Sequence, residues 1–450
     1  MERNERKAHK VAFETEFLVL EDNGAVSSRV DDIMKIARKT DLDFFLRKEY
    51  THNMLEITSN PSVKVRKSAR AWLKEMRKVV EIAKKIGLRL YPYGTYTGTF
   101  APTARTDKYY RMCETVLGPS RFVKNAGRCI GFHLHYCLPY RTFNKQTRQL
   151  NRLFKSKYRE ELLNVYNLIL ALDPAMTNFM ESSPFVDGVY HAKDSRLFLY
   201  RSMTLNKKDR YLEGLYADRE IWGGLPRYAH SITDLIMLTE KRYRTWIGLL
   251  KREHPEYLRV AKTRHPLQFN WSPLRINKVG TFEYRGMDMN LPSHISGTSL
   301  LFKSLFRKVR NEEITVRPCD IGIKEPFKIE GQNMYVPPYH YLDEKLQYHS
   351  ALKGFESDEV FKYSKSMASL AIKAMPDRKD PGISRIRQML ETRKTKSDEL
   401  LARARKRGQN IRERLDESVA QEMALEACDE FEKELEILPD KELLIDLMEE

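Results

Sequence analysis

Hydrophobic and polar residues alternate along the chain with two different periods, and each period predicts its own kind of element. Residues 11–20 alternate at every second position, and residues 88–91 form a short apolar run, both of which are typical of strands. Between them, residues 62–86 place apolar side chains at every third or fourth position, as an amphipathic helix does, and residues 29–38 look similar. The pattern therefore predicts a fold in which strands alternate with helices.

The same two periods return further along the chain. Strands are expected at residues 128–138 and 280–288, and helices at residues 146–172, 231–251 and 295–309. Two segments follow neither period. Residues 92–107 are rich in Gly, Pro and Thr, which predicts a loop long enough to act as a substrate lid. Residues 181–230 mix Gly, Pro, aromatic and basic residues, and we expect loops there as well.

The composition changes after Met375. Residues 376–381 read Pro-Asp-Arg-Lys-Asp-Pro, which indicates a linker, and the residues beyond it are nearly free of Gly, Pro and aromatic side chains. Apolar residues recur there at every fourth position, namely Ile411, Leu415, Val419 and Met423. This spacing drifts around a helix too fast for a long coiled coil, so we expect helices that pack on the body or form a short hairpin. We therefore divide the chain into a body, residues 1–375, and a charged helical C-terminal extension, residues 376–450.

Charge adds a second distinction between these parts. The 450 residues include 79 Lys and Arg against 62 Asp and Glu, a formal net charge of +17. Residues 411–450 hold four Lys or Arg and fifteen Asp or Glu, a net of −11, so residues 1–410 carry +28. A surplus of this size is compatible with nucleic acid, an anionic membrane surface or polyanionic small substrates. The acidic end could fold back on the basic part, or it could recruit a protein partner or a second copy of the chain.

The composition excludes several classes of protein. Apolar residues make up 41% and aromatic residues 10%, which are globular proportions and argue against a disordered chain. The first ten residues are largely charged, and no run of about 18 apolar residues occurs, so neither a secretory signal nor a transmembrane helix is expected. Five cysteines, an odd number without CxxC spacing, argue against a disulfide framework and a zinc ribbon. We therefore expect a cytoplasmic protein with reduced thiols and no membrane partner.

Acidic residues occur inside the predicted strands. Glu14 and Glu16 lie two positions apart, so their carboxylates emerge from the same face of a strand. Taken alone, this pair is typical of a solvated edge strand. Glu49 and Glu56 flank the segment Tyr-Thr-His-Asn-Met-Leu, and Glu56 lies inside the apolar run 54–57. A carboxylate in such a run is either at the surface of a strand or held by a cation.

Two further strands carry polar side chains on one face. His133 and His135 lie two apart, and a pair of this kind is more often structural than catalytic. Thr281, Glu283 and Arg285 share one face of their strand, where an ion pair within the strand is the simplest explanation.

Taken together, these strands carry five Glu, two His and one Arg, and such groups need compensation when they gather in one concavity. Oxygen ligands with few cysteines point to Mg²⁺ or Mn²⁺ rather than zinc. The chain has no GxxxxGK[ST] and no GxGxxG motif, so a nucleotide would be held through metal-bridged phosphates and Arg or Lys side chains.

The order and spacing of these residues resemble the glutamate-cysteine ligase type 2 family of carboxylate–amine ligases, over about residues 10–300. The motifs that carry the resemblance are Glu14-x-Glu16-Phe17, Glu49 with Glu56, Gly131-Phe-His133-Leu-His135, Asn270-Trp271 with Arg275, and Gly280-Thr281-x-Glu283-x-Arg285-x-x-Asp288. The resemblance implies an α+β fold like that of glutamine synthetase: a curved, mainly antiparallel sheet with helices packed outside. Its concave face would hold ATP, Mg²⁺ and an acidic substrate, which makes the body the catalytic domain.

The resemblance also implies roles for individual residues. The implied ligands of the ion that bridges the ATP phosphates are Glu14, His133 and Glu283, and those of the ion nearer the acyl acceptor are Glu16, Glu49 and Glu56. Arg285 would neutralise the transferring γ-phosphoryl group, and Arg196 and Arg275 would bind the substrate carboxylate or the nucleotide phosphates. His135 is expected to support the site or to be structural.

The expected function is an ATP- and Mg²⁺-dependent ligase that forms an amide through an acyl phosphate. Its plausible substrates are the γ-carboxylate of glutamate and the amine of cysteine. A carboxylate is a poor electrophile at neutral pH, which is why ATP must activate it. Three alternatives stay open: the same chemistry on another acid, amine or peptide; a basic nucleic-acid-binding protein, for which no recognised motif is present; and a non-catalytic scaffold. We expect small amino-acid substrates as partners.

Overall fold

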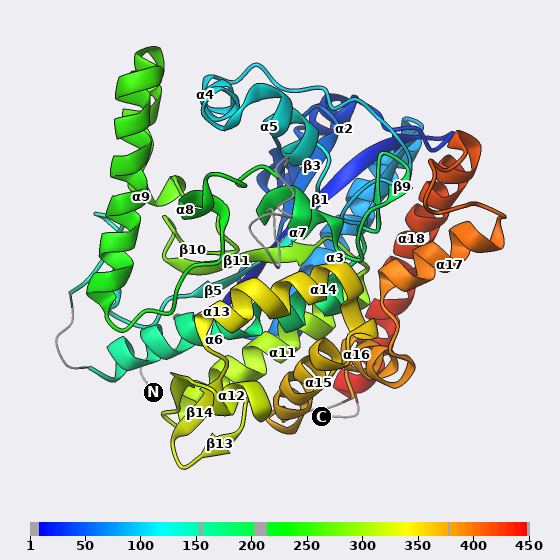
Figure 1. The fold of residues 1–450 in the computed structure, drawn as a ribbon. Coiled ribbons are helices and arrows are strands. Elements are labelled where there is room, and N and C mark those ends of the chain that lie inside the picture. Colours follow the sequence, from blue (N-terminus) through cyan, green and yellow to red (C-terminus); the bar gives the residue numbers. More distant parts are fainter. Residues whose placement is uncertain (1–8, 153–155, 202–213, 377–378, 448–450) are drawn as a thin grey trace.

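The computed structural model describes residues 9–152, 156–201, 214–376 and 379–447 (Figure 1). Two residues of the expected linker, 377 and 378, therefore lie outside the described residues. Within the described part, no helix is both long and apolar enough to cross a lipid bilayer.

A seven-stranded sheet forms the centre of the described chain. In spatial order its strands are β10 (Leu274–Asn277), β11 (Thr281–Asp288), β5 (Gly131–Cys137), β1 (Val11–Glu21), β3 (Met54–Thr58) and β2 (Leu46–Lys48), with β4 (Leu88–Tyr91) also paired to β1. Every pairing in this sheet is antiparallel. The class expected from the sequence, α+β with an antiparallel sheet, is thus confirmed.

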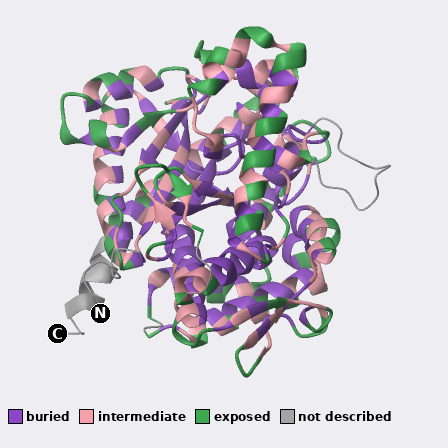
Figure 2. Ribbon diagram, turned by 90° about the vertical axis from the view of Figure 1, so that its left-hand side faces the viewer, coloured by how far each residue is buried: buried purple, intermediate pink, exposed green. Residues whose placement is uncertain are grey.

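Three long helices cover one face of the sheet: α3 (Val65–Lys85), α6 (Lys157–Met180) and α11 (Pro292–Asn311). The rings of Phe282 and Tyr284 on β11 lie on Tyr166 of α6 and Phe302 of α11, at 6.1 and 5.0 Å between centroids. Figure 2 shows buried residues gathered in the interior strands and in the helices that pack on them. Because side chains alternate along a strand, this packing leaves the opposite face of β11 and its neighbours for polar groups.

Shorter elements complete the fold. The remaining helices of the body are α2 (Val30–Ala37), α4 (Lys108–Leu117), α5 (Pro119–Ala126), α7 (Ser195–Arg201), α8 (Glu220–Gly223), α9 (Ile232–Glu253), α10 (Leu258–Lys262), α12 (Ile321–Lys324), α13 (Tyr339–Tyr341), α14 (Gln347–Lys353) and α15 (Asp358–Lys373). Short 3-10 or π turns are η1 (Asp41–Phe44), η2 (Pro255–Tyr257), η3 (Pro266–Gln268), η4 (Leu342–Leu346) and η5 (Gly354–Glu356). The small sheets pair β6 (Phe143–Asn144) with β7 (Gln149–Leu150), β8 (Phe185–Val186) with β9 (Val189–Tyr190), and β14 (Asn333–Val336) with β12 (Thr315–Pro318) and β13 (Ile329–Glu330).

The predicted start of the helix expected at residues 146–172 is wrong. The chain first makes the β6–β7 hairpin, in which Arg148 adopts a positive φ of 54° that no helix contains. The helix α6 begins only after Ser156, whose hydroxyl accepts the backbone N–H of Tyr158 at 3.2 Å. It then continues to Met180, eight residues beyond the expected end.

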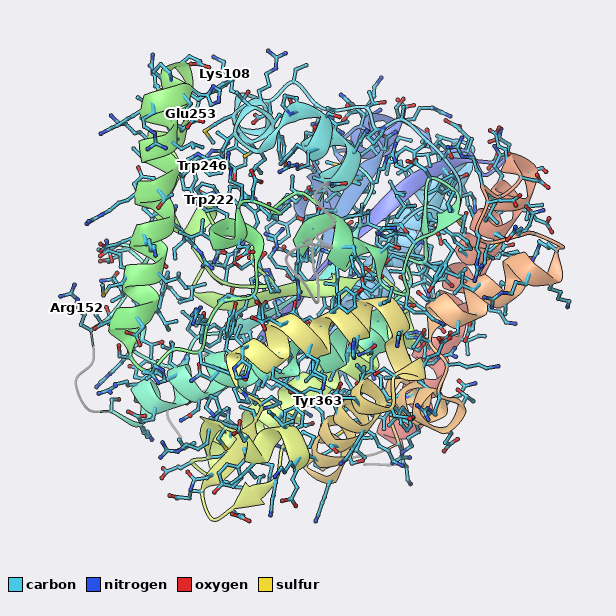
Figure 3. The ribbon with its side chains drawn as sticks, in the orientation of Figure 1. Lys108, Arg152, Trp222, Trp246, Glu253 and Tyr363 are labelled. Carbon is cyan, nitrogen blue, oxygen red and sulfur yellow. The ribbon has the colours of Figure 1, made fainter. Side chains whose placement is uncertain are left out.

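Other expected elements are found close to their predicted bounds. The helix expected at 231–251 is α9, and Ser231 and Asp234 form a capping box at its start. Residues 181–230 are mainly loop in their described part, but α7, α8 and the β8–β9 hairpin interrupt them. A second apolar cluster fixes this side of the molecule, where Trp222 of α8 meets Trp246 of α9 edge to face at 5.0 Å (Figure 3).

The loop expected at residues 92–107 is present, and its first half is buried. Tyr96 donates its hydroxyl hydrogen to the carbonyl of Gly24 at 2.7 Å, and Thr97 donates to the carbonyl of Ala420 at 2.7 Å. These bonds fasten the loop between the body and the C-terminal helices. A lid role, which stays a prediction, would therefore involve residues 99–107 only.

The C-terminal residues form three helices, α16 (Pro381–Thr392), α17 (Lys396–Lys406) and α18 (Glu417–Leu447), and they pack on the body. The ring of Phe431 on α18 lies 5.1 Å from that of Phe17 on β1. Arg89 on β4 pairs with Glu432 at 2.9 Å and with Asp429 at 2.7 Å. The acidic end thus folds back on basic side chains. This was one of the arrangements that the sequence left open, the other being recruitment of a partner. The boundary after residue 375 stays a prediction.

Candidate functional site

The central strands bring three carboxylates together. Glu16 on β1 lies directly opposite Glu56 on β3, and Glu49 follows the end of β2. One carboxylate oxygen of each lies within 4.8 Å of the others. Like charges placed directly across a strand pair destabilise a sheet, so the arrangement needs a compensating cation.

A second group lies beside the first one. It contains Glu14 of β1, His135 of β5 and Glu283 of β11, which offer one ligand atom each within 4.8 Å of one another. Nε2 of His135 is 3.0 Å from Oε1 of Glu14. Its other ring nitrogen, Nδ1, lies 2.9 Å from the hydroxyl of Thr281. A second partner of this kind fixes the orientation of a metal-binding imidazole.

His133 lies between the two groups. Its Nδ1 is 3.3 Å from Oε2 of Glu14, and its Nε2 is 3.6 Å from Oε1 of Glu16. The sequence-based assignment gave His133 to the group of Glu14 and Glu283 and left His135 in a supporting role. The structure brings the ring of His135 into that group, because β11 places Glu283 opposite His135.

Glu283 is fully buried among cationic and polar side chains. Nε of Arg275 donates to its Oε2 at 2.7 Å, Nη1 of Arg285 lies 3.3 Å from its Oε1, and the amide of Asn277 also donates to it. Burial by itself would raise the pKa of Glu283, but the two guanidinium groups lower it to about 2. The carboxylate is therefore ionised at neutral pH.

Arg196 does not line the cavity that the acidic residues share. It is buried, its Nη2 donates to the backbone carbonyl of Arg285 at 3.2 Å, and its guanidinium lies 5.1 Å from the ring centre of Tyr200. In this conformation Arg196 supports Arg285 from behind. Its expected contact with substrate or nucleotide stays a prediction.

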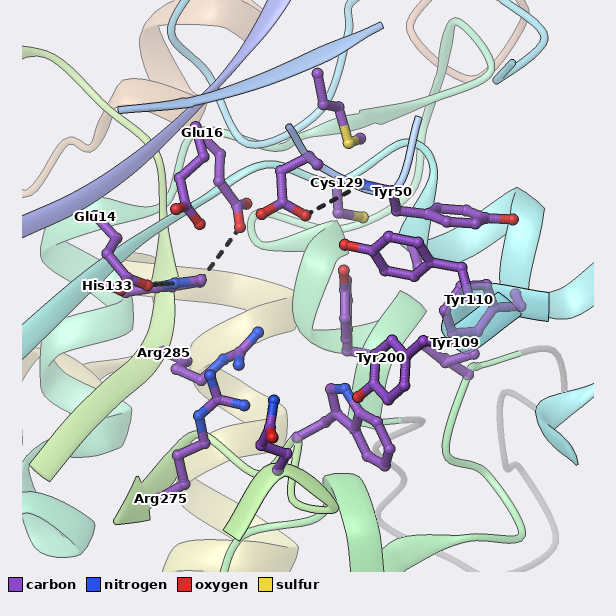
Figure 4. A pocket seen from close by; sticks show the side chains of 18 of the residues that line it. Glu14, Glu16, Tyr50, Tyr109, Tyr110, Cys129, His133, Tyr200, Arg275 and Arg285 are labelled. Atoms are coloured by element: carbon purple, nitrogen blue, oxygen red, sulfur yellow. Dashed lines mark hydrogen bonds and ion pairs between the residues drawn. The ribbon is translucent and has the colours of Figure 1, made fainter. Parts of the chain in front are cut away.

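The three carboxylates of the first group and Glu14 of the second line one cavity of about 410 Å³, whereas His135 and Glu283 of the second group are buried next to Glu14. Figure 4 shows Glu14, Glu16 and His133 on one side, with Arg275 and Arg285 pointing toward them. The opposite wall is aromatic and consists of Tyr50, Tyr109, Tyr110, Phe122, Tyr200, Tyr216 and Trp271. The sequence analysis missed this wall, although Tyr50 adjoins Glu49 and the pair Tyr109-Tyr110 opens the helix after the long loop.

The pKa values of the carboxylates are shifted in opposite directions in the two groups. Burial would raise the pKa of Glu14, but the imidazoles of His135 and His133 lower it well below its usual range. Burial raises the pKa of Glu16, with Glu49 adding to the rise. Burial also raises the pKa of Glu49 and, further, that of Glu56, which faces Glu14 and Glu49 as well. A bound divalent ion would oppose this rise in the pKa values of Glu16, Glu49 and Glu56.

The donors of both groups fit hard divalent cations. The first group offers three carboxylates, and the second offers two carboxylates and one imidazole that is already oriented by Thr281. Oxygen-rich sets of this kind suit Mg²⁺ or Mn²⁺, and the single imidazole is tolerated. An arginine-lined cavity with two such groups can bring polyphosphate and a second anion together.

Comparison of the sequence with known protein families shows to which class and family the chain belongs. A sequence model of the glutamate-cysteine ligase family 2 (GCS2) matches residues 11–422. Fold, site and match together define a member of the carboxylate–amine ligases. The chain belongs to the glutamate-cysteine ligase family 2. The match extends past the motifs at residues 10–300 and into the start of α18. Among curated proteins, no sequence match is found.

Solved structures that are similar to this chain include a glutathione synthetase and a glutamate–cysteine ligase. The bifunctional glutathione synthetase from Pasteurella multocida has a TM-score of 0.56 and 12% sequence identity, over 94% of this chain. This chain spans about half, 53%, of that protein. The glutamate–cysteine ligase from Francisella tularensis in complex with AMP has a TM-score of 0.48 and 13% identity, over 96% of this chain and 95% of that one. At 12% identity, the similarity to the glutathione synthetase supports the fold alone.

Proposed function

We propose that the protein is an ATP- and Mg²⁺-dependent ligase that joins a carboxylate to an amine through an acyl phosphate. The observation that carries this proposal is the pair of acidic groups that could each hold a cation, which reach one cavity through Glu14, Glu16, Glu49 and Glu56, with Arg285 beside both. Family membership supports the reaction class. We propose the γ-carboxylate of glutamate as the acid and cysteine as the amine, because the family is named for that pair.

The two acidic groups would hold the divalent cations. Glu14, His135 and Glu283 would bind one ion, with His133 able to reach it from the adjacent position, and Glu16, Glu49 and Glu56 would bind the other. When bound, such cations neutralise phosphate charge and allow two anions to approach each other. Mn²⁺ would serve the same donors.

The arginines and the aromatic wall have separate tasks in this proposal. The guanidinium of Arg285 would stabilise the negative charge that develops on the transferring phosphoryl group, because its planar donors match phosphate oxygens. Arg275 keeps Glu283 ionised and would add positive charge for the substrate carboxylate or the phosphates. The tyrosines and Trp271 would exclude water from the acyl phosphate, which water would otherwise hydrolyse.

The proposal also covers the curvature of the sheet, the location of the protein in the cell and the role of the C-terminal extension. We propose that the sheet is curved like that of glutamine synthetase and that the site lies on its concave side. Five unpaired cysteines fit a cytoplasmic protein. Because Arg89 and Lys84 already pair with Glu432, we propose that the extension serves the body rather than a homo-oligomer or a separate protein partner.

The test is to incubate the pure protein with ATP, Mg²⁺ and mixtures of amino acids, and to measure ADP and new amides by mass. The proposal expects ADP release that requires both an acid and an amine. It also expects loss of that release in Glu56→Gln but not in Glu240→Gln, a control at an exposed position on α9. An amide of another acid or amine would change the substrates only. ADP release that is independent of any amine would contradict the proposal.

A further inference from the structure

Arg285 lies in an irregularity of strand β11. The pairing of β11 with β5 shifts between Tyr284 and Met287, which leaves Arg285 and Gly286 without partners in the β5 ladder. The backbone N–H of Arg285 donates to the carbonyl of Pro273 at 2.7 Å, which continues the pairing with β10 by one residue. The carbonyl of Arg285 accepts from Arg196. The guanidinium proposed to act on the phosphoryl group thus starts from a bulge, where β5 provides no regular sheet pairing to fix its direction.

A buried ion pair lies against this bulge. Arg201, at the end of α7, donates through Nη1 to Oδ2 of Asp173 on α6 at 2.5 Å and through Nη2 to Oδ1 at 2.9 Å. Gln347 of α14 accepts a further hydrogen bond from Arg201 at 2.8 Å. The hydroxyl of Tyr284, on the strand itself, donates to Oδ1 of Asp173 at 2.7 Å. Three helices are therefore joined to β11 by polar contacts in a region without water access.

The atoms of this ion pair fill the space next to Gly286. A Cβ at this position would lie 2.5 Å from Oδ1 of Asp173 and 2.8 Å from Nη2 of Arg201. It would also lie 2.5 Å from the hydroxyl of Tyr284. Contacts this short do not occur, so a side chain here must displace either the ion pair or the strand. Only glycine allows the bulge and the pair to be in contact.

We infer that the buried Arg201–Asp173 pair is a positioning device for Arg285, because it holds Gly286 and thereby sets the direction in which the Arg285 guanidinium points. The inference rests on the proposed function, since it concerns the same site. Replacing a buried ion pair by apolar residues is often neutral for stability, so stability alone does not explain a bidentate pair at this place. The contact of the Arg201–Asp173 pair with Gly286 in the bulge does explain why the pair lies here.

The inference predicts a specific kinetic defect. Gly286→Ala should lower kcat roughly 10²-fold, the size of effect that a misplacement of about 1 Å produces. The KM for ATP should stay near the parental value, because the nucleotide would be held chiefly by the two cation-binding groups. Arg285→Ala provides the second test, since a change that acts only through Arg285 costs little further activity once that side chain is gone.

A milder variant guards against loss of folding. Tyr284→Phe keeps the ring on Phe302 and removes only the hydroxyl that joins Asp173 to the strand. Tyr363→Phe is its matched control, since the buried Tyr363 hydroxyl donates to the backbone carbonyl of Ala171 on the same helix α6, at 2.6 Å, rather than to Asp173. Both variants should lose similar stability, and only Tyr284→Phe should lose kcat.

Three results would overturn the inference. The first is parental kcat in folded Gly286→Ala or Tyr284→Phe. The second is equal loss of kcat in Tyr284→Phe and Tyr363→Phe. The third is a Gly286→Ala effect that is as large in the Arg285→Ala protein as in the parent. If the parent forms no amide from any acid and amine, the proposed function fails separately. The crystal structure of Tyr284→Phe then decides, because an unchanged Arg285 guanidinium beside Glu283 would contradict the positioning role.

Discussion

Glu283 determines the charge balance of the site. It contacts Arg275, Arg285 and Asn277, and it also completes the group formed with Glu14 and His135. One carboxylate therefore restrains two guanidinium groups and offers an oxygen to a cation. A change at Glu283 should affect stability and metal binding together, whereas a change at Arg285 should affect turnover alone.

We expect Arg285→Ala to lower acid-dependent ADP release by ~10² to 10³, the usual cost of losing one preorganised donor to a developing oxyanion. ATP binding should be affected less than turnover, because the charge of Arg285 matters most during phosphoryl transfer. Glu283 keeps Arg275 and Asn277, so the variant should fold. The measurement is kcat at saturating ATP, with Arg244→Ala on the exposed side of α9 as control. A parental rate would rule out the role proposed for Arg285.

Glu283→Gln should destabilise the protein in the absence of metal, because Arg275 and Arg285 lose their common counter-charge. Removing one partner of a fully buried pair costs about 3–5 kcal/mol, and we expect less here because the two arginine side chains are 18% and 20% exposed. Denaturant unfolding of the metal-free protein measures the change. Glu21→Gln, which breaks a surface pair with Arg29, should cost little stability, because water and salt screen exposed charges. Equal effects of the two substitutions would contradict the central place of Glu283.

The acidic side chains that the sequence singles out lie close together in two groups, whereas the sequence says less about the partners of these side chains. Glu14 and Glu16 share a strand face because the side-chain period of a strand is two, and this follows from spacing alone. The choice between His133 and His135 depends on the register of β11 against β5, which is a long-range property. For the same reason, spacing cannot reveal that Arg196 lies behind Arg285.

At the scale of elements, local signals compete with long-range packing. The period of three to four predicts most of α6, but the hairpin before it depends on the left-handed turn at Arg148, which the apolar pattern does not contain. The bulge at Arg285 is invisible for a similar reason. A strand pattern records which residues alternate, and it does not record where two residues of one strand lie opposite a single residue of its neighbour.

The helix α18 contributes a side chain to the central core. Phe431 is fully buried between Phe17 of β1 and Trp72 of α3. Phe431→Ala should therefore lower the free energy of unfolding by ~3–5 kcal/mol, the range for a large core side chain replaced by alanine. Ile437→Ala on the same helix is the control, because Ile437 is 38% exposed. Equal midpoints of urea unfolding for the two variants would show that α18 packs only loosely on the body.

Glu181 joins the end of α6 to the start of α17. It is fully buried and accepts a hydrogen bond from the hydroxyl of Thr395 at 2.6 Å. Burial raises its pKa well above the ordinary value; the charges of Asp398 and Asp194 add to the rise, and Lys193 opposes it. The folded protein therefore binds a proton that the unfolded chain releases. Stability must fall as pH rises from the ordinary glutamate pKa toward the raised one.

Glu181→Gln removes this titration and keeps an oxygen that can accept from Thr395. The melting temperature of the variant, relative to the parent, should therefore increase as pH rises above the ordinary glutamate pKa. Melting curves at several pH values check this expectation, with the exposed Glu240→Gln as a control whose difference from the parent should not depend on pH. A difference that shrinks as pH rises would mean that Glu181 is charged in the folded protein.

At the scale of the whole molecule, charge and core lead to different divisions of the chain. Charge separates a basic part, residues 1–410, from an acidic end, and composition marks a boundary near residue 376. The hydrophobic core extends across both boundaries, since Ile383, Leu401 and Phe431 belong to one cluster with the strands of the body. The acidic surface of α18 then lies on basic side chains such as Arg89 and Lys84, which lowers the net repulsion within the body.

The contact between Phe17 and Phe431 has a consequence for the order of events during synthesis. The first strand of the sheet leaves the ribosome long before the helix that covers it, which follows tens of seconds later at ordinary rates of translation. Throughout that interval β1 can pair with its neighbouring strands, but part of its apolar face stays open to other chains. A nascent chain that stalls before α18 would carry the complete set of acidic residues and an uncovered core. Such a chain is a natural client for chaperones and a natural starting point for aggregation.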